Sequence, residues 1–257
     1  MPYDPQLSIE GAGDPVVLVP GINGTREIFY RQVPCLSRAY RVATYSLRDD
    51  PPSMDVLVDD LDKVIEAVAS EAGQTTVIAE SFGGTVAMSL ALARPSRVRA
   101  LMIVNSFSRY ARSQIALARA GLSMLPWPVM KPIRRLAAFR MHSPHTPREE
   151  VRRFISITDR TAKAGYVYRL RLLRDYDLRP RLAELRVPVL FVACDQDHLV
   201  PSVSEARLMA SLAPQSSVRI LRGQGHVCII APGVDFGQML DEWKASGYRL
   251  QATGYGL

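Results

Sequence analysis

The sequence contains few cysteines and few histidines, and their scarcity limits the chemistry it can support. Three cysteines occur in 257 residues, an odd number without the spacing of a metal site, and they predict reduced thiols in a cytoplasmic protein. They are Cys35, Cys194 and Cys228. Of the four histidines, His142 and His145 are three apart, but Pro144 would break a helix that aimed both at one ion. We therefore expect no metal and no cofactor.

Long apolar runs are also missing. No stretch approaches the roughly 20 apolar residues that a membrane-spanning helix needs. Residues 1–5 contain no basic region followed by an apolar run, so we expect neither a secretory signal nor a transmembrane segment. Hydrophobic residues still make up 47% of the chain, which is enough to bury a full core at this length.

Acidic residues are scarce in one segment. Residues 106–181 contain 17 Arg or Lys but 5 Asp or Glu, a net charge of +12, whereas the whole chain carries +7. The charges have two interpretations: arginines on solvated helix faces, or attraction of an anionic substrate, an acidic protein partner or lipid headgroups. No nucleic-acid-binding motif accompanies the charge, so we expect no nucleic-acid partner.

Apolar runs and helical periodicity alternate along most of the chain. The runs predict strands near residues 6–10, 16–19, 41–46, 75–79, 99–104, 188–193 and 217–221. The periodic segments predict helices near residues 54–71, 82–93, 202–212 and 235–246. On the first helix, Asp59, Asp60 and Asp62 are expected on the outer face. The alternation predicts an α/β fold with a mostly parallel sheet covered by helices on both faces, and with the strand near 6–10 at its edge.

Residues 79–84 read A-E-S-F-G-G between a predicted strand and a predicted helix. A serine on such a sharp turn is typical of the nucleophile elbow of α/β-hydrolases, which presents the hydroxyl at the top of the sheet. The residues two before and two after the serine must be small, because the strand and helix backbones nearly touch there. Ala79 and Gly83 occupy these places around Ser81, and Ala79 departs from the usual glycine.

An acid and a histidine follow Ser81 in the order that this motif requires. Asp195 and Asp197 come after the predicted strand 188–193, and His226 comes after the strand 217–221. A serine hydroxyl needs a base, an imidazole can supply it, and a carboxylate fixes the imidazole tautomer. We assign Ser81 as nucleophile, His226 as general base and acid, and Asp197 as the orienting carboxylate. Asp195 is the rival acid, and we expect it to bond the loop backbone instead.

These motifs together resemble the α/β-hydrolase fold family, in its serine-nucleophile branch with a helical cap. The resemblance implies an oxyanion hole formed by the backbone N–H groups of Phe82 and Ile22. Ile22 lies in the loop after the predicted strand 16–19, where Pro20 replaces the family's usual histidine. The resemblance also implies hydrolysis of carboxylic esters or thioesters of small molecules through an acyl-enzyme. The positive charge of residues 106–181 would favour an anionic substrate.

The interruption of the alternation at residues 106–180 resembles the family's cap, inserted after the sixth strand. The core would then comprise residues 1–105 and 181–257. Helix-like segments are predicted at 108–121, 129–141, 147–163 and 165–175. The apolar candidates for the pocket face of this cap are Met124, Trp127, Met130, Phe139, Met141 and Phe154.

A narrower likeness suggests other functions. Residues 24–25, 29–32, 105–108 and 124–131 are similar to stretches of maspardin, a member of the same fold family. This likeness implies a weakly catalytic or non-catalytic protein that binds a protein partner through the basic cap. The intact Ser81, Asp197 and His226 favour an enzyme instead. The same triad also serves carbon–carbon bond hydrolases and cofactor-free peroxidases, which stay as alternatives.

Overall fold

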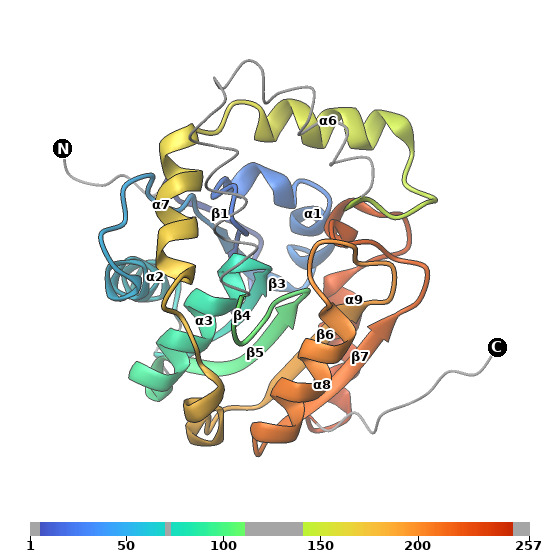
Figure 1. The fold of residues 1–257 in the computed structure, drawn as a ribbon. Helices are drawn as coiled ribbons and strands as arrows, with labels where there is room; N and C mark the ends of the chain where they lie inside the picture. Colours follow the sequence, from blue (N-terminus) through green and yellow to red (C-terminus); the bar gives the residue numbers. More distant parts are fainter. Residues whose placement is uncertain (1–5, 70–72, 111–140, 249–257) are drawn as a thin grey trace.

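The computed structural model describes residues 6–69, 73–110 and 141–248 (Figure 1). Within these ranges seven strands form one sheet in the order β1-β3-β2-β4-β5-β6-β7. The strands are β1 (Ser8–Glu10), β2 (Asp14–Val19), β3 (Tyr40–Thr44), β4 (Thr75–Glu80), β5 (Val98–Val104), β6 (Val189–Cys194) and β7 (Ser216–Leu221). The edge strand β1 is antiparallel to β3 and the other pairs are parallel, which confirms the predicted class and the predicted edge strand.

The described helices agree with the predicted ones to within a few residues. The four predicted from the alternation are α2 (Met54–Val68), α3 (Phe82–Ala93), α8 (Ser202–Leu212) and α9 (Phe236–Ala245). The shorter elements are α1 (Gln32–Leu36) and the 3-10 helices η1 (Arg26–Phe29), η2 (Pro95–Arg97), η3 (Arg179–Glu184) and η4 (Cys228–Ile230).

The central strands β2, β4, β5 and β6 are almost entirely buried, because both faces of the sheet are covered there. Val17 of β2 and Val77 of β4 point to one face, where they pack with Leu61 of α2. Their neighbours on the strands point to the other face, as Leu18 does where it packs with Trp243 of α9. The two apolar layers fix the sheet between the helices and so set the positions of the loops at its edge.

Helix α2 is amphipathic and begins at an N-cap, Ser53, whose hydroxyl accepts a hydrogen bond from the Val56 amide. Asp59 is exposed and pairs with Arg94, as expected for the outer face. The expectation for Asp60 was wrong: its carboxylate is buried and forms two hydrogen bonds of 2.6 Å with Arg48. The paired arginine is what allows a charged residue on the inner side of this helix.

Two further helices, α6 (Arg148–Thr158) and α7 (Lys163–Leu173), follow β5 and precede β6 in the chain. They confirm the helices predicted at 147–163 and 165–175. The start of the helix predicted at 108–121 is wrong, because residues 108–110 are not helical and Arg109 forms a bridge with Asp177. The predictions at residues 111–140 fall outside the described residues. The segment follows the fifth described strand rather than the sixth. Helix α6 lies across the top of the molecule in Figure 1 and contacts η1 and η4. The domain boundaries at residues 106 and 180 stay a prediction.

Candidate active site

Ser81 occupies a strained turn between β4 and α3. Its backbone has φ 50° and ψ −120°, a conformation that residues other than glycine rarely adopt. A Cβ on Gly83 would lie 2.5 Å from the Val19 carbonyl oxygen and 2.6 Å from that of Pro20. The turn therefore packs directly against the backbone of β2, as the small residues in the motif predicted. Strain of this kind costs about 1–3 kcal/mol and persists because neighbouring structure enforces it.

The loop after β5 provides part of that enforcement. The Ser81 amide donates to the Val104 carbonyl at 2.8 Å, and the Ser106 hydroxyl donates to the Ser81 carbonyl at 2.7 Å. Next to Ser106, the Asn105 side chain donates to the His226 carbonyl at 2.8 Å and accepts from the Cys194 amide at 2.9 Å. Two adjacent polar residues thus hold the turn, the end of β6 and the histidine loop together.

The structure brings Ser81, His226 and Asp197 into one chain of hydrogen bonds. The His226 Nε2 lies 3.1 Å from the Ser81 Oγ, and its Nδ1 lies 2.7 Å from the Asp197 Oδ2. All three side chains are buried or nearly so. This is the geometry in which an imidazole can accept the serine proton while a carboxylate fixes its tautomer.

Asp197 is held rigidly, and its rival Asp195 points elsewhere. The Asp197 Oδ1 accepts from the amides of Leu199 and Val200 at 2.9 Å each, and its Oδ2 accepts from the Ser202 hydroxyl. The Asp195 carboxylate instead accepts from the Gly223 amide at 2.7 Å, which ties the acid loop to the loop after β7. The structure therefore places Asp197 against the imidazole and Asp195 against backbone, as expected.

The charges around the imidazole shift its pKa. Burial alone would lower the pKa of His226, but the hydrogen bond and charge of Asp197, together with the charge of Glu80, raise it above its ordinary value. Burial would raise the pKa of Asp197, yet the hydrogen bond and charge of His226 hold it below its ordinary value. Both shifts favour the imidazolium–carboxylate pair, which is the state that forms when Ser81 gives up its proton.

The two residues predicted as oxyanion donors belong to the elements around Ser81. Phe82 is the first residue of α3, and a helix leaves the N–H groups of its first turn unpaired. Ile22, in the loop after β2, lines the same pocket as Ser81 and His226. The positive end of the helix dipole adds to the attraction for an anion at this place.

Glu80 is also a component of the site, although the sequence pattern around Ser81 predicts no role for it. It is 5% exposed, and its Oε1 lies 3.6 Å from the His226 Nε2, the same nitrogen that faces Ser81. A Cβ on Gly21 would lie 2.2 Å from its Oε2, so the glycine makes room for this carboxyl group. Burial raises the pKa of Glu80 to about 7, although the His226 charge and a hydrogen bond from the Gly21 amide oppose the rise. The burial of Glu80 was hidden in the sequence because it depends on Gly21, 59 positions away.

Glu80→Gln should change how stability depends on pH. Because the folded-state pKa of Glu80 is raised to about 7, its contribution to stability is present at acidic pH and is lost as the pH rises through 7. Unfolding in urea should therefore show the Gln variant gaining roughly 2–3 kcal/mol on the wild type between pH 5 and pH 8. Glu149→Gln, at an exposed position on α6, is the control and should leave the difference flat. If the difference in unfolding free energy between Glu80→Gln and the wild type also stays constant from pH 5 to pH 8, Glu80 is ionised over this whole range.

A small apolar cavity of about 220 Å³ lies above Ser81 and His226. Residues of the inserted segment form much of its wall: Met141, Phe154, Ile155, Thr158 and Tyr166. Of the pocket candidates predicted from the sequence, Met141 and Phe154 are confirmed as lining residues, and Met124, Trp127, Met130 and Phe139 lie outside the described residues. The cavity suits an apolar acyl or alcohol group, and Ser81 at its base is only 6% exposed.

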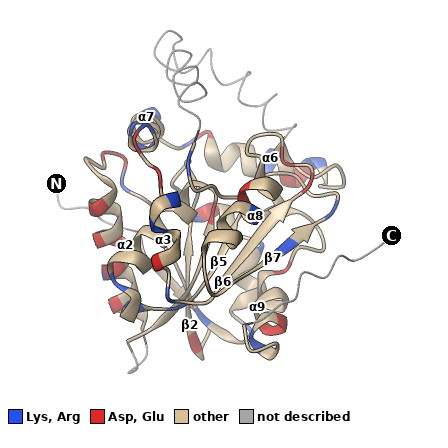
Figure 2. Ribbon diagram, turned by 60° about the horizontal axis from the view of Figure 1, so that its bottom comes forward, with Lys and Arg blue, Asp and Glu red and all other residues tan. Residues whose placement is uncertain are grey.

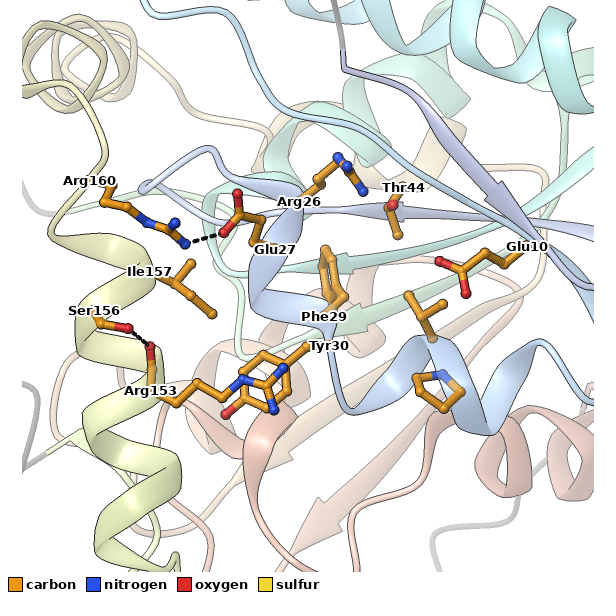
Figure 3. A pocket seen from close by; sticks show the side chains of 12 residues that line it. Glu10, Arg26, Glu27, Phe29, Tyr30, Thr44, Arg153, Ser156, Ile157 and Arg160 are labelled. Atoms are coloured by element: carbon orange, nitrogen blue, oxygen red, sulfur yellow. Dashed lines mark hydrogen bonds and ion pairs between the residues drawn. The ribbon is translucent and has the colours of Figure 1, made fainter.

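A second hollow of about 460 Å³ is lined by residues of α6, η1 and α1 (Figure 3). Its walls carry two arginines of the basic segment, and both have partners in the core. Arg160 pairs with Glu27, and the Arg153 guanidinium stacks over the Tyr30 ring, 3.9 Å from its centroid. Part of the excess charge thus fastens this segment to the core. Figure 2 shows basic positions on α7 and acidic positions along α2. Acidic residues of α2 pair with core arginines, as Asp59 does with Arg94.

No cluster of three or more His, Cys, Asp or Glu side chains suited to a metal ion occurs in the part of the chain that the structure describes. The three cysteine thiols are free. None of the described helices is both long and apolar enough to cross a membrane.

A family profile described as alpha/beta hydrolase fold matches residues 14–230. The chain belongs to this family. Among curated proteins, it is 26% identical over 246 residues to a protein of Escherichia coli O157:H7 provisionally named carbamate hydrolase RutD, covering 90% of this chain and 91% of that protein. The protein of the same name from Escherichia coli O81 is 28% identical over 249 residues, with the same coverage.

Solved structures of this fold are also similar. The enol-lactonase of Burkholderia xenovorans LB400 superposes with a TM-score of 0.80 at 18% identity, over 93% of this chain and 95% of that one. A thermophilic esterase of Thermogutta terrifontis superposes with a TM-score of 0.80 at 20% identity, and the match covers 95% of this chain and 93% of that one. A bromoperoxidase of Bacillus anthracis superposes with a TM-score of 0.80 at 18% identity, and the match covers 93% of this chain and 94% of that one. At these identities the likeness establishes the fold, and the local likeness to maspardin stays a prediction.

Proposed function

We propose that this chain is a serine hydrolase that cleaves carboxylic ester or thioester bonds. The observation that carries the proposal is the hydrogen-bonded chain from Ser81 through His226 to Asp197 beneath an apolar cavity. A strained turn and a buried imidazole between a hydroxyl and a carboxylate are features that cluster at active sites, and they favour an enzyme over a protein that only binds a partner.

The reaction follows from the positions of these groups. The Ser81 Oγ attacks the substrate carbonyl carbon while its proton passes to the His226 Nε2, and the amides of Phe82 and Ile22 hold the resulting oxyanion. The bond to the leaving group then breaks, and His226 returns the proton to the departing alkoxide or thiolate. Water, deprotonated by His226, attacks the acyl-enzyme, and the acid leaves as Ser81 recovers its proton.

Carbamates form a second candidate substrate class. The relatives that span 90% of this chain are named for carbamate hydrolysis. A carbamate carbonyl would meet the same nucleophile and the same oxyanion donors. Esters remain our first choice because the cavity wall is mostly apolar. Its described lining includes Glu80 and Asp159 and no arginine or lysine, so a preference for anionic acyl groups rests on the net charge of residues 106–181 alone. The free thiols agree with action in the cytoplasm.

A fluorophosphonate probe tests the proposal directly. We expect covalent labelling of the folded protein, with the adduct located on Ser81 by mass spectrometry, and turnover of at least one member of a panel of p-nitrophenyl esters, acyl thioesters and aryl carbamates. Ser81→Ala is the matched control, and it should show neither labelling nor turnover. A folded protein that resists the probe and cleaves nothing in the panel would favour the maspardin-like partner-binding alternative.

A further inference from the structure

The inserted segment places a fully buried arginine against the core. Arg169 lies on α7, and its side chain is 0% exposed. Removing a guanidinium from water is costly unless its donors are satisfied. A buried arginine therefore needs hydrogen-bond acceptors in the protein, and these acceptors identify the segments that Arg169 links.

Those acceptors belong to two loops at the top of the sheet. The Arg169 Nε donates to the Ile22 carbonyl at 2.8 Å, and its Nη2 donates to the Asn23 carbonyl at 3.2 Å. Its Nη1 donates to the Arg48 carbonyl at 2.8 Å, in the loop after β3. Asp49, whose carboxylate lies 3.4 Å from Nη2, is half exposed and supplies the counter-charge. A single side chain thus ties α7 to the loop that carries the predicted oxyanion donor.

Two glycines make room for this guanidinium. A Cβ on Gly24, which has φ +76°, would lie 2.6 Å from the Arg169 Cζ. A Cβ on Gly165, one turn earlier on α7, would lie 2.4 Å from the Arg169 Nη2 and 2.1 Å from the Asp49 Oδ1. The loop and the helix are therefore both shaped around the arginine.

The hydrogen bonds fix the peptide groups on both sides of Ile22. The Gly21 carbonyl accepts from the Gly24 amide at 2.9 Å, and the Ile22 carbonyl accepts from Arg169. Because a peptide group is planar, holding the Gly21 carbonyl also sets the direction of the Ile22 N–H. The hydrogen bond from Arg169 to the Ile22 carbonyl holds the next peptide group, and this limits rotation of the Gly21–Ile22 peptide group.

We propose that Arg169 is a positioning residue of the oxyanion hole, which holds the loop of residues 20–25 so that the Ile22 amide faces the reacting carbonyl. It takes the bracing place left open by Pro20, where the family usually has a histidine. Because Arg169 belongs to α7, the oxyanion hole is complete only when the inserted segment is docked. The inference rests on the proposed hydrolase function for its catalytic consequence, and on the contacts alone for its structural one.

The first test uses a substrate pair that differs in one atom. A p-nitrophenyl ester and its thionoester react with the same serine, but the thiocarbonyl sulfur accepts hydrogen bonds poorly and gains little from the oxyanion hole. In Arg169→Lys and Arg169→Met we expect kcat for the ester to fall about 10–100-fold at little change in KM, with a much smaller fall for the thionoester. Arg171→Lys and Arg171→Met, at an exposed position on the same helix, should leave both substrates unchanged.

Equal losses on ester and thionoester would overturn the proposed role, since they would show a general loss of structure. Gly165→Ala keeps Arg169 in the chain but displaces its guanidinium, so it covers the case in which the Arg169 variants do not fold. We expect the same selective loss of ester turnover from it. An unchanged ester-to-thionoester ratio in Gly165→Ala would count against the proposal.

The second test needs no turnover, so it separates this inference from the hydrolase function. Amide hydrogen exchange of the peptide that covers residues 20–25 should become faster in Arg169→Lys than in the wild type, and should not change in Arg171→Lys. Unchanged exchange in the Arg169 variant would show that the arginine does not hold the loop. If the wild type cleaves nothing yet the exchange result appears, the hydrolase proposal fails while the bracing role stands.

Discussion

Asp197→Asn should lower kcat/KM for an ester substrate by about 10³–10⁴-fold, while the protein stays folded. The Asp197 Oδ2 lies 2.7 Å from the His226 Nδ1, so the carboxylate requires the proton on Nδ1 and leaves Nε2 free to accept the proton of Ser81. An amide nitrogen at this place would donate to Nδ1 instead and would select the opposite tautomer. The loss would appear mainly in kcat, because the imidazolium forms only as the reaction proceeds.

The matched control is Asp195→Asn, two residues away in the same loop. The Asp195 carboxylate accepts from the Gly223 amide and does not face the imidazole, so we expect a loss of less than about tenfold. Both variants are to be measured with the same ester over a pH series, and folding is to be checked by circular dichroism. A larger loss in Asp195→Asn than in Asp197→Asn would reverse our assignment of the acid.

Local patterns were sufficient to predict the core of this fold. Strands buried on both faces appear as continuous apolar runs, and each of the runs from 16–19 to 217–221 became a strand within about two residues of its predicted bounds. The candidate residues Ser81, Asp197 and His226 could be found because each follows a strand, and parallel strands bring their ends to one edge of the sheet. Their positions after successive strands therefore predicted that these residues lie close together in space.

The supporting residues could not be predicted in this way, because their roles depend on distant partners. Arg169 was part of a basic segment interpreted as solvated or ligand-attracting, whereas its acceptor at Ile22 lies 147 positions earlier in the chain. Asp60 was expected at the surface and is buried by its pairing with Arg48. Such pairs are formed by tertiary packing, and no periodicity marks them.

The two small residues that flank the candidate nucleophile are not equivalent, and Gly83→Ala should show it. Alanine is already present at position 79, where its methyl group joins the core between sheet and helices. At position 83 a methyl group would meet the backbone carbonyls of Val19 and Pro20 at 2.5 and 2.6 Å. Those oxygens belong to the last residue of a central strand and to the residue after it, and they cannot rotate away as a side chain could.

We therefore expect Gly83→Ala to lower the free energy of unfolding by about 3 kcal/mol or more, measured in urea, and to abolish ester turnover in any protein that folds. Turnover should be lost because Val19 and Pro20 lead directly into the loop that carries Ile22, so a shift of this backbone moves a predicted oxyanion donor. Gly237→Ala is the control: its methyl group would have its nearest neighbour at 3.1 Å, the Asp235 side chain, and alanine is the better helix former in α9. Equal stability of the two variants would show that β2 yields to the added methyl group, and the close backbone approach would then not be what requires glycine at position 83.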